Sequence, residues 1–146
     1  MKIRKLNLDE LPIVLDLVEE FDREPAERPD LSLMKQILDR ISSNGGAILG
    51  AELNGVIVGT STLAICPNLS WSGRSYAIIE NVVVSKAFRR RGIGKALMLE
   101  AQSLAKEADC YKIALMTGSQ RTLTFKFYEA CGFIGNKTGF QLRFNA

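Results

Sequence analysis

Apolar residues recur along this chain in two periods, and the change of period predicts where helices and strands alternate. A period of three to four residues predicts a helix over residues 9–21, with Asp9 as the N-cap and one apolar face made of Leu11, Val14, Leu15, Val18 and Phe21. The same period predicts a second helix that Ser32 opens and that carries Leu33, Met34, Ile37, Leu38 and Ile41.

Two further helices follow later in the chain. The longer one spans about 93–108 and buries Ile93, Ala96, Leu97, Ala101, Leu104, Ala105 and Ala108. The shorter one includes Phe125, Phe127 and Tyr128 and ends near Cys131, where Gly132 is placed to adopt a positive φ. All four helices have one apolar face and are expected to pack on a sheet.

Short runs rich in β-branched residues predict the strands of that sheet. They are residues 2–6, two runs between 47 and 65, residues 76–84, 111–117 and 140–144, with a further short strand at Phe133 and Ile134. The two runs between 47 and 65 flank Asn54-Gly55, which predicts a tight antiparallel hairpin because both residues accept positive φ.

The predicted order of elements is β-α-α-β-β-β-α-β-α-β. This order indicates an α+β or mixed-sheet fold. No internal repeat, linker or low-complexity segment interrupts the 146 residues, so we expect residues 1–146 to form a single domain.

Composition narrows the kinds of site that this domain can contain. Hydrophobic residues make up 47% of the chain, enough to bury a core without metal or disulfide staples. The three cysteines have no metal-ligand spacing and the chain has no histidine, so we expect no disulfide framework, no metal site and no imidazole chemistry. The N-terminus lacks a signal sequence and no apolar stretch approaches the ~18 residues of a membrane span, which favours a cytoplasmic protein.

The net charge of +3 is small, but its local distribution is uneven. The cations gather at Lys86, Arg89, Arg90, Arg91 and Lys95. A short cluster of this kind favours one local anionic ligand over a nucleic acid, which needs a long basic face. A small nucleic-acid binding domain therefore stays as a rival interpretation, with an affinity that falls steeply with salt.

The cations lie within "VVVSKAFRRRGIGKAL", residues 82–97, where a strand passes into a helix. Gly92 and Gly94 would let backbone N–H groups approach a bound group, and the first turn of the helix would add its unpaired N–H donors. Arginine can bind phosphate oxygens in bidentate fashion, so an anion such as a pyrophosphate would fit. Alternatively, the glycines only make a tight turn and the arginines form a solvated face.

Two motifs in this chain resemble those of the GNAT superfamily of N-acetyltransferases. Arg89, Gly92 and Gly94 match its acyl-CoA pyrophosphate motif, [QR]-x-x-G-x-[GA], and "FYEACGF", residues 127–133, resembles its FYxxxGF signature. The motifs occur in the family's order, separated by one helix and one strand. The resemblance implies the mixed, mostly antiparallel GNAT sheet flanked by helices, and transfer of acetyl from acetyl-CoA, the acyl-donor substrate, to an amine acceptor.

By the same resemblance, two groups of residues would contact acetyl-CoA. The backbone of Val82, Val83 and Val84, on a strand that splays from its neighbour, would pair with the pantetheine arm. The turn would hold the pyrophosphate with Arg89, Arg90, Arg91, Gly92, Ile93, Gly94 and Lys95. A plain buried valine strand is equally compatible with the sequence, because these contacts use only backbone atoms.

Glu80 is the candidate general base. It interrupts an apolar strand, "YAIIENVVV", where a carboxylate is costly unless it is paired or used, and partial burial would raise its pKa toward that of a working base. The stretch "IIENVVV" also resembles the "IEDVVV" type of strand in glucosamine-6-phosphate N-acetyltransferases, with Asn81 in place of the second acidic residue. Alternatively, Glu80 is an ion-paired or solvent-edge glutamate.

Tyr128 is the candidate general acid, because it matches the superfamily tyrosine beside the thioester sulfur. A phenol needs only to be positioned to return a proton to the departing thiolate. The alternative is a core tyrosine on the inner face of its helix. Cys110 and Cys131 lack a base that would activate a thiol nucleophile, so we expect direct transfer rather than a covalent intermediate.

The acceptor is left open by the sequence. By resemblance, two loops frame its pocket and carry Glu24, Glu27, Arg28, Trp71 and Arg74, all of which could equally be ordinary loop residues. Small amines, amino sugars, aminoglycosides, polyamines and protein amines all remain open. The main alternative function is a non-catalytic acyl-CoA sensor or interaction module on the same fold, and the resemblance implies that a homodimer is common.

Two turns before its tyrosine, the family often has an asparagine that contacts the CoA arm. This chain has Arg121 and Thr124 in that region, so that contact would be different here.

Overall fold

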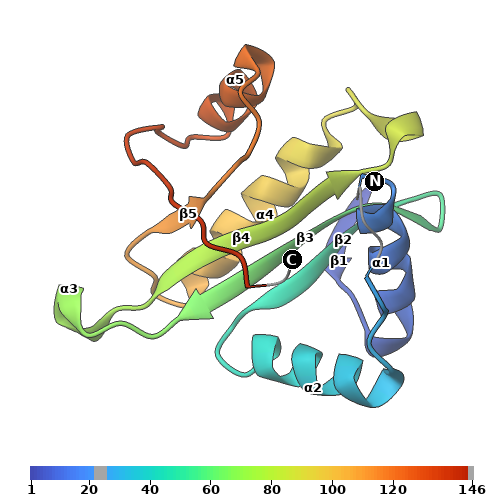
Figure 1. Cartoon of the computed structure of the whole chain (residues 1–146), viewed down its shortest axis with the longest axis horizontal. Coiled ribbons are helices and arrows are strands. Elements are labelled where there is room, and N and C mark those ends of the chain that lie inside the picture. Colours follow the sequence, from blue (N-terminus) through green and yellow to red (C-terminus); the bar gives the residue numbers. More distant parts are fainter. Residues whose placement is uncertain (22–25, 145–146) are drawn as a thin grey trace. The chain divides into compact units, whose positions relative to one another are not determined.

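The computed structural model describes residues 1–21 and 26–144. The chain divides into two compact units, Met1–Leu115 and Met116–Ala146, which are described separately. The first unit contains the whole sheet and the second contains one helix (Figure 1). The predicted fold class, an α+β fold with a mostly antiparallel sheet, is confirmed.

Five strands form the sheet in the order β1-β2-β3-β4-β5, which is also their order along the chain. Their bounds are Lys2–Lys5 (β1), Ala47–Leu53 (β2), Val56–Cys66 (β3), Tyr76–Val84 (β4) and Ile113–Leu115 (β5). Neighbours from β1 to β4 pair antiparallel, and β5 pairs with β4 in parallel. The hairpin turn predicted at Asn54 and Gly55 is confirmed, with φ of 51° and 80°.

The helices of the described first unit that pack on this sheet are α1 (Leu11–Glu19), α2 (Leu31–Ser42) and α4 (Ile93–Glu107). The single turn α3 (Ser70–Gly73) lies in the connection between β3 and β4, and 3-10 turns lie at Leu8–Glu10 and Lys86–Phe88. Residues of α1 and α2 share one apolar cluster with Ile48 and Ile57 of the sheet, while α4 packs on β3 and β4 (Figure 1). None of the helices in the described residues has the length and hydropathy of a membrane span.

Both predicted helix caps are wrong. Asn7 begins the first helical turn, and the Glu10 carboxylate accepts a hydrogen bond from its backbone N–H at 2.9 Å. Asp30 begins α2, and its carboxylate accepts from the N–H of Leu33 at 2.8 Å. Each helical segment begins two residues before the predicted cap: the first has a capping box between Asn7 and Glu10, and in the second the Asp30 carboxylate satisfies a free N–H group.

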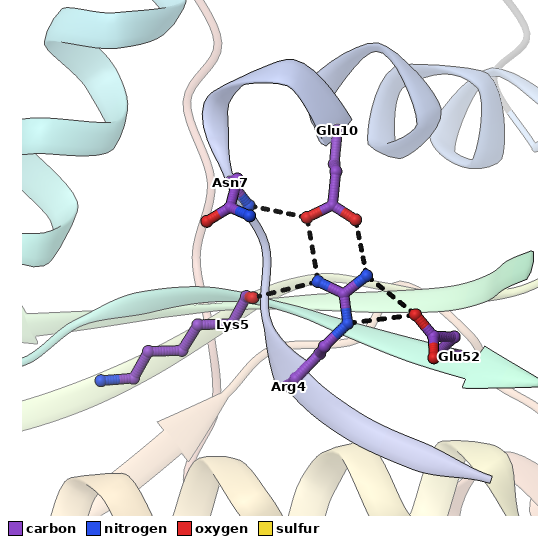
Figure 2. Close-up of polar contacts among 5 residues, drawn as sticks. All are labelled: Arg4, Lys5, Asn7, Glu10 and Glu52. Carbon is purple, nitrogen blue, oxygen red and sulfur yellow. Dashed lines mark hydrogen bonds and ion pairs between the residues drawn. The ribbon is translucent and has the colours of Figure 1, made fainter. Parts of the chain in front are cut away.

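A cluster of three charged side chains joins the start of the chain to the sheet (Figure 2). The Arg4 guanidinium donates to Glu10 at 2.6 and 2.9 Å and to Glu52 at 2.9 and 3.2 Å. These hydrogen bonds lower the pKa of Glu10 to about 2, with the hydrogen bond from Arg4 as the largest cause. The side chains of this cluster therefore link three elements: β1, β2 and the 3-10 turn that precedes α1.

The second unit contains α5 (Thr122–Ala130) and otherwise irregular chain. The predicted strands at residues 133–134 and 140–144 are wrong, and β5 is shorter than the predicted strand at 111–117. Phe140, Leu142 and Phe144 alternate as in a strand but are 91%, 80% and 95% exposed. An alternating pattern becomes a strand only when a ladder partner and a covered face stabilise it.

Candidate active site

The outer edge of β4 loses its partner halfway along the strand. Parallel pairing with β5 includes only Ala77–Ile79, opposite Ile113–Leu115. From Glu80 to Val84, the described residues supply a partner on the β3 side alone. Unpaired N–H and C=O groups on a strand edge can pair with an extended ligand. The end of this pairing is compatible with the splayed valine strand that the family resemblance implies.

A bulge lies where the two strands part. Thr60 of β3 pairs with Val83 and Thr62 pairs with Glu80, so β4 advances three residues while β3 advances two. Asn81, inside this step, has a φ of 54°. Asparagine tolerates this left-handed conformation better than most residues, and a bulge of this kind bends and twists its strand. The sequence analysis missed this feature, for which an asparagine within a β-branched run was the available signal.

Glu80 lies directly before the bulge, and its side chain is exposed. The expectation that Glu80 is partly buried is wrong, because β4 leaves the cover of β5 at the preceding residue, Ile79. No carboxylate–cation pair among the described residues includes Glu80. The carboxylate is thus accessible at the edge where the backbone of β4 is unpaired.

The turn after β4 ends at a glycine that opens α4. Arg90 has a φ of 63° and Gly92, the N-cap of α4, has a φ of 77°. Gly92 has no side chain to cap the helix, so the first N–H groups of α4 have no intrahelical acceptor and receive no cap from their N-cap residue. These N–H groups and the positive end of the helix dipole favour an anion at this position.

The start of α4 is held close to the sheet by packing. Ile93 is 2% exposed and Leu97 is fully buried, and both lie over Gly59 of β3. A Cβ at Gly59 would be 3.2 Å from side-chain atoms of Ile93 and Leu97 and from the carbonyl oxygen of Val83. Gly59 therefore permits the close approach. The side chain of Ile93 is buried against the sheet, so only the backbone of Ile93 can make the predicted contact with a ligand.

Exposed cations surround this helix N-terminus. Arg89 donates from Nε to the carbonyl oxygen of Val84 at 3.4 Å, and its guanidinium lies 4.5 Å from the centre of the Phe21 ring. The guanidinium of Arg91 lies 5.3 Å from the centre of the Phe88 ring. No carboxylate of the described residues forms an ion pair with these arginines. Their positive charge is thus available to an external anion.

Tyr128 belongs to the second unit and Glu80 to the first, so each is described within its own unit. Tyr128 lies in the last turn of α5, which ends in a Schellman motif: Phe133 N–H donates to the Tyr128 carbonyl at 3.1 Å and Gly132 N–H to the Glu129 carbonyl at 2.9 Å. The predicted positive φ of Gly132 is confirmed at 97°. The Phe133 ring meets the Tyr128 ring edge-on at 6.4 Å.

The Schellman motif explains why a glycine followed by an aromatic residue, Gly132-Phe133, comes after α5. Gly132 reverses the chain and so returns Phe133 to the tyrosine ring. Burial, with a smaller contribution from Cys131, raises the pKa of the Tyr128 phenol above its ordinary value. The phenol thus keeps its proton at neutral pH.

The residues expected around an acceptor have partners of their own within the first unit. Trp71 stacks on Tyr111 with ring centres 5.2 Å apart, and Arg74 donates to the backbone carbonyl oxygens of Asp109 and Cys110. Arg28 forms ion pairs with Asp16 and Glu19, and Glu27 is exposed. Glu24 lies outside the described residues. The ordinary-loop interpretation accounts for these contacts.

The cysteines show no sign of activation. Cys66, Cys110 and Cys131 form no disulfide within the described part of the chain, and burial raises the pKa of the Cys110 thiol, which disfavours its thiolate.

The chain is similar to known proteins in sequence and in structure. The model of the Acetyltransferase (GNAT) family matches residues 11–133. A glucosamine 6-phosphate N-acetyltransferase of Trypanosoma brucei brucei is 38% identical over 79 residues, which are 54% of this chain and 52% of that protein. A probable glucosamine 6-phosphate N-acetyltransferase of Drosophila melanogaster is 30% identical over 96 residues, 61% of this chain and 41% of that protein. The chain spans about half the length of the curated relatives it matches.

Solved structures match over nearly the whole chain. A protein of Agrobacterium tumefaciens str. C58 assigned as an acetyltransferase has a TM-score of 0.86 and 38% identity, covering 98% of this chain and 99% of its own. Glucosamine-6-phosphate N-acetyltransferase from Arabidopsis thaliana has a TM-score of 0.84 at 23% identity, covering 99% of this chain and 98% of its own, and supports the fold.

Proposed function

This chain belongs to the GNAT acetyltransferase family, and on that premise we propose that it transfers acetyl from acetyl-CoA to the primary amine of a small molecule or peptide. One observation carries the proposal: the unpaired edge of β4 leads directly to the glycine-capped N-terminus of α4 among uncompensated cations. An extended chain with an amide-bearing arm and an anionic end suits both parts of that surface.

The donor would be bound mainly through backbone atoms. The N–H and C=O groups of Val82, Val83 and Val84 would pair with the pantetheine arm. The turn from Arg89 to Lys95 would hold the pyrophosphate through its N–H groups and through the side chains of Arg89, Arg90, Arg91 and Lys95. The exposed position of these cations supports the proposal.

Glu80 and Tyr128 would move the protons. Glu80, through a water, would accept a proton from the acceptor ammonium, which frees the nitrogen lone pair to attack the thioester carbonyl carbon. The new N–C bond forms as the C–S bond breaks, the nitrogen releases its second proton to solvent as the amide forms, and Tyr128 would give its proton to the departing thiolate. Solvent then takes the proton from Glu80 and restores the one on Tyr128. The raised pKa of Tyr128 supports this role, since it keeps the phenol protonated before the reaction.

For the acceptor we propose glucosamine 6-phosphate as the first candidate, because relatives of 38% and 30% identity carry that activity in their names. We further propose that both units form one N-acetyltransferase domain, residues 1–146, which the family match across Leu115 and Met116 supports. A cytoplasmic location is supported by the three cysteines, which form no disulfide among the described residues. A homodimer is part of the same proposal, and sedimentation equilibrium would test it.

The test is CoA thiol release from acetyl-CoA over a panel of amines, with mass spectrometry of the products. The panel includes glucosamine 6-phosphate, an aminoglycoside, a polyamine and a peptide with a free N-terminus. An enzyme-only blank corrects for Cys66, Cys110 and Cys131. Amine-dependent release of CoA with an N-acetylated product would support the proposed transferase activity. Glu80→Gln should lower the rate of that release. Tight acetyl-CoA binding without turnover across the panel would favour the sensor instead.

A further inference from the structure

The end of α1 contacts the turn that precedes α4, far along the sequence. Phe21, just past the last residue of α1, has the Arg89 guanidinium 4.5 Å and the Lys86 ammonium 5.8 Å from its ring centre. The neighbouring Glu20 carboxylate accepts a hydrogen bond from the Ser85 hydroxyl at 3.2 Å. Two successive residues thus contact both sides of the 3-10 turn that leads into the cation cluster.

These contacts restrain the side chain of Arg89 at two points. Its Nε donates to the Val84 carbonyl at 3.4 Å, and the central carbon of its guanidinium, Cζ, lies 4.5 Å from the centre of the Phe21 ring. Stacking uses the face of a guanidinium, whereas hydrogen bonds to phosphate oxygens use its edge. The ring contact is therefore compatible with anion binding by the same arginine.

A restrained arginine loses less freedom when it binds. A free arginine side chain is among those that lose most rotamer freedom on being fixed, and a guanidinium already held in place avoids part of that loss. Arg90, in contrast, has no ring contact among the described residues, and Arg91 uses the separate ring of Phe88. Of these three arginines, only Arg89 contacts the ring of Phe21 in the described structure.

We infer that Phe21 is a positioning residue for the donor: its ring holds the Arg89 guanidinium ready for the pyrophosphate of acetyl-CoA. The inference rests on the proposed binding of acetyl-CoA but not on turnover. It adds to the donor site a residue about 70 positions away in sequence, next to the loop between α1 and α2.

Calorimetric titration with CoA tests the inference without any acceptor. Phe21→Leu keeps an apolar side chain but removes the aromatic face, and should weaken CoA binding about fivefold. Phe21→Tyr keeps the face and should bind CoA as the wild type does. Pantetheine, which lacks the pyrophosphate, should bind the wild type and Phe21→Leu equally.

A double-mutant cycle separates positioning from general damage to the fold. In an Arg89→Ala background, Phe21→Leu should have no further effect on CoA binding, whereas in a Lys86→Met background it should keep its full effect. An equal loss in the Arg89→Ala background, a loss for pantetheine, or an unchanged affinity of Phe21→Leu would overturn the inference. If the wild type binds CoA but shows no turnover, the proposed transferase activity is contradicted and the inference about Phe21 still holds. A wild type that does not bind CoA would overturn both.

Discussion

Two arginine-containing regions of the first unit, around Arg4 and around Arg89, differ in whether carboxylates of the fold neutralise the positive charge. Arg4 is enclosed by the carboxylates of Glu10 and Glu52 (Figure 2). Arg89 and Arg91 contact aromatic rings, and the described residues offer them no carboxylate. The first region is neutralised within the fold, while the second keeps its charge at the open N-terminus of a helix.

The difference separates a structural ion pair from a binding site. A guanidinium with its own carboxylates has little affinity left for an external anion, and its removal leaves those carboxylates unpaired. A guanidinium placed over a ring keeps its hydrogen-bonding edge for a ligand. The two regions should therefore respond to substitution in different measurements, one in stability and the other in affinity.

The largest effect is expected from the uncompensated cluster. Changing Arg89, Arg90 and Arg91 together to Gln should weaken CoA binding about a hundredfold, at about fivefold for each lost charge-assisted contact. The melting temperature should change little, because no described carboxylate depends on these side chains. Calorimetry with CoA and thermal denaturation of the same preparations measure both quantities.

Arg4→Gln is the matched control for this triple variant. It should lower the melting temperature by several degrees and leave the affinity for CoA unchanged. The contrast between the two regions would be lost if Arg4→Gln weakened CoA binding, or if the triple variant unfolded as readily as Arg4→Gln.

Tyr128 sharpens the contrast, because it is proposed to act through a neutral hydroxyl rather than through charge. Tyr128→Phe should lower kcat tenfold or more with little change in the KM for acetyl-CoA, the scale of a lost acid group. Single-turnover kinetics ensure that the chemical step is observed. An unchanged rate of that step would remove Tyr128 from the role of general acid.

Gly92→Ala tests the backbone part of the binding region. No atom lies within 4 Å of a Cβ built at Gly92, so the cost arises from its φ of 77° alone. The left-handed conformation costs an alanine about 1–2 kcal/mol. We expect the KM for acetyl-CoA to rise about fivefold as the turn relaxes away from this geometry.

Gly55→Ala provides a control with the same backbone cost. Gly55 has a φ of 80° and equally open surroundings, but it lies in the β2–β3 hairpin. It should lower stability and leave the KM unchanged. Equal changes of KM in the two variants would mean that the turn at Gly92 has no special role in donor binding.

The smallest effect is expected from acid titration of the neutralised region. The pKa of Glu10 is lowered to about 2 from an ordinary value near 4.5, because Arg4 stabilises the ionised carboxylate. A lowered pKa in the folded state means stability that is fully present above about pH 4.5 and is lost as the pH falls toward 2. In urea denaturation, the free energy of unfolding of the wild type should exceed that of Glu10→Gln by a constant difference above pH 5. Below pH 4.5 this difference should become smaller as the pH falls. A difference independent of pH would contradict this assignment.

Local patterns in the sequence were enough to predict most elements of the first unit. Residues 76–84 form a strand with the predicted bounds, and α4 begins at Ile93 directly after Gly92. These segments combine a strong period with a conformational requirement that few residues meet, such as positive φ at Asn54, Gly55 and Gly92. Helix caps were less certain, since Asn7 and Asp30 compete for the role with nearby residues of similar chemistry.

Other features depend on partners that a local pattern does not name. The alternation at residues 140–144 has the period of a strand, but the described structure leaves it irregular and exposed. Glu80 is flanked by apolar residues in the sequence, yet it is exposed because β5 ends opposite Ile79. Phe21 satisfies the period of a core helix, and only the packing of α1 against the turn brings it to Arg89.

The sequence by itself determined the fold class, the turn at Gly92 and the two motifs that identify the family, because each depends on a few residues close together in the chain. The tertiary structure decided which arginines are neutralised, since Arg4 and Glu52 meet across paired strands and Arg89 and Phe21 meet across the fold. It also decided where the edge of β4 is open, since a strand edge is open or closed only according to its neighbour.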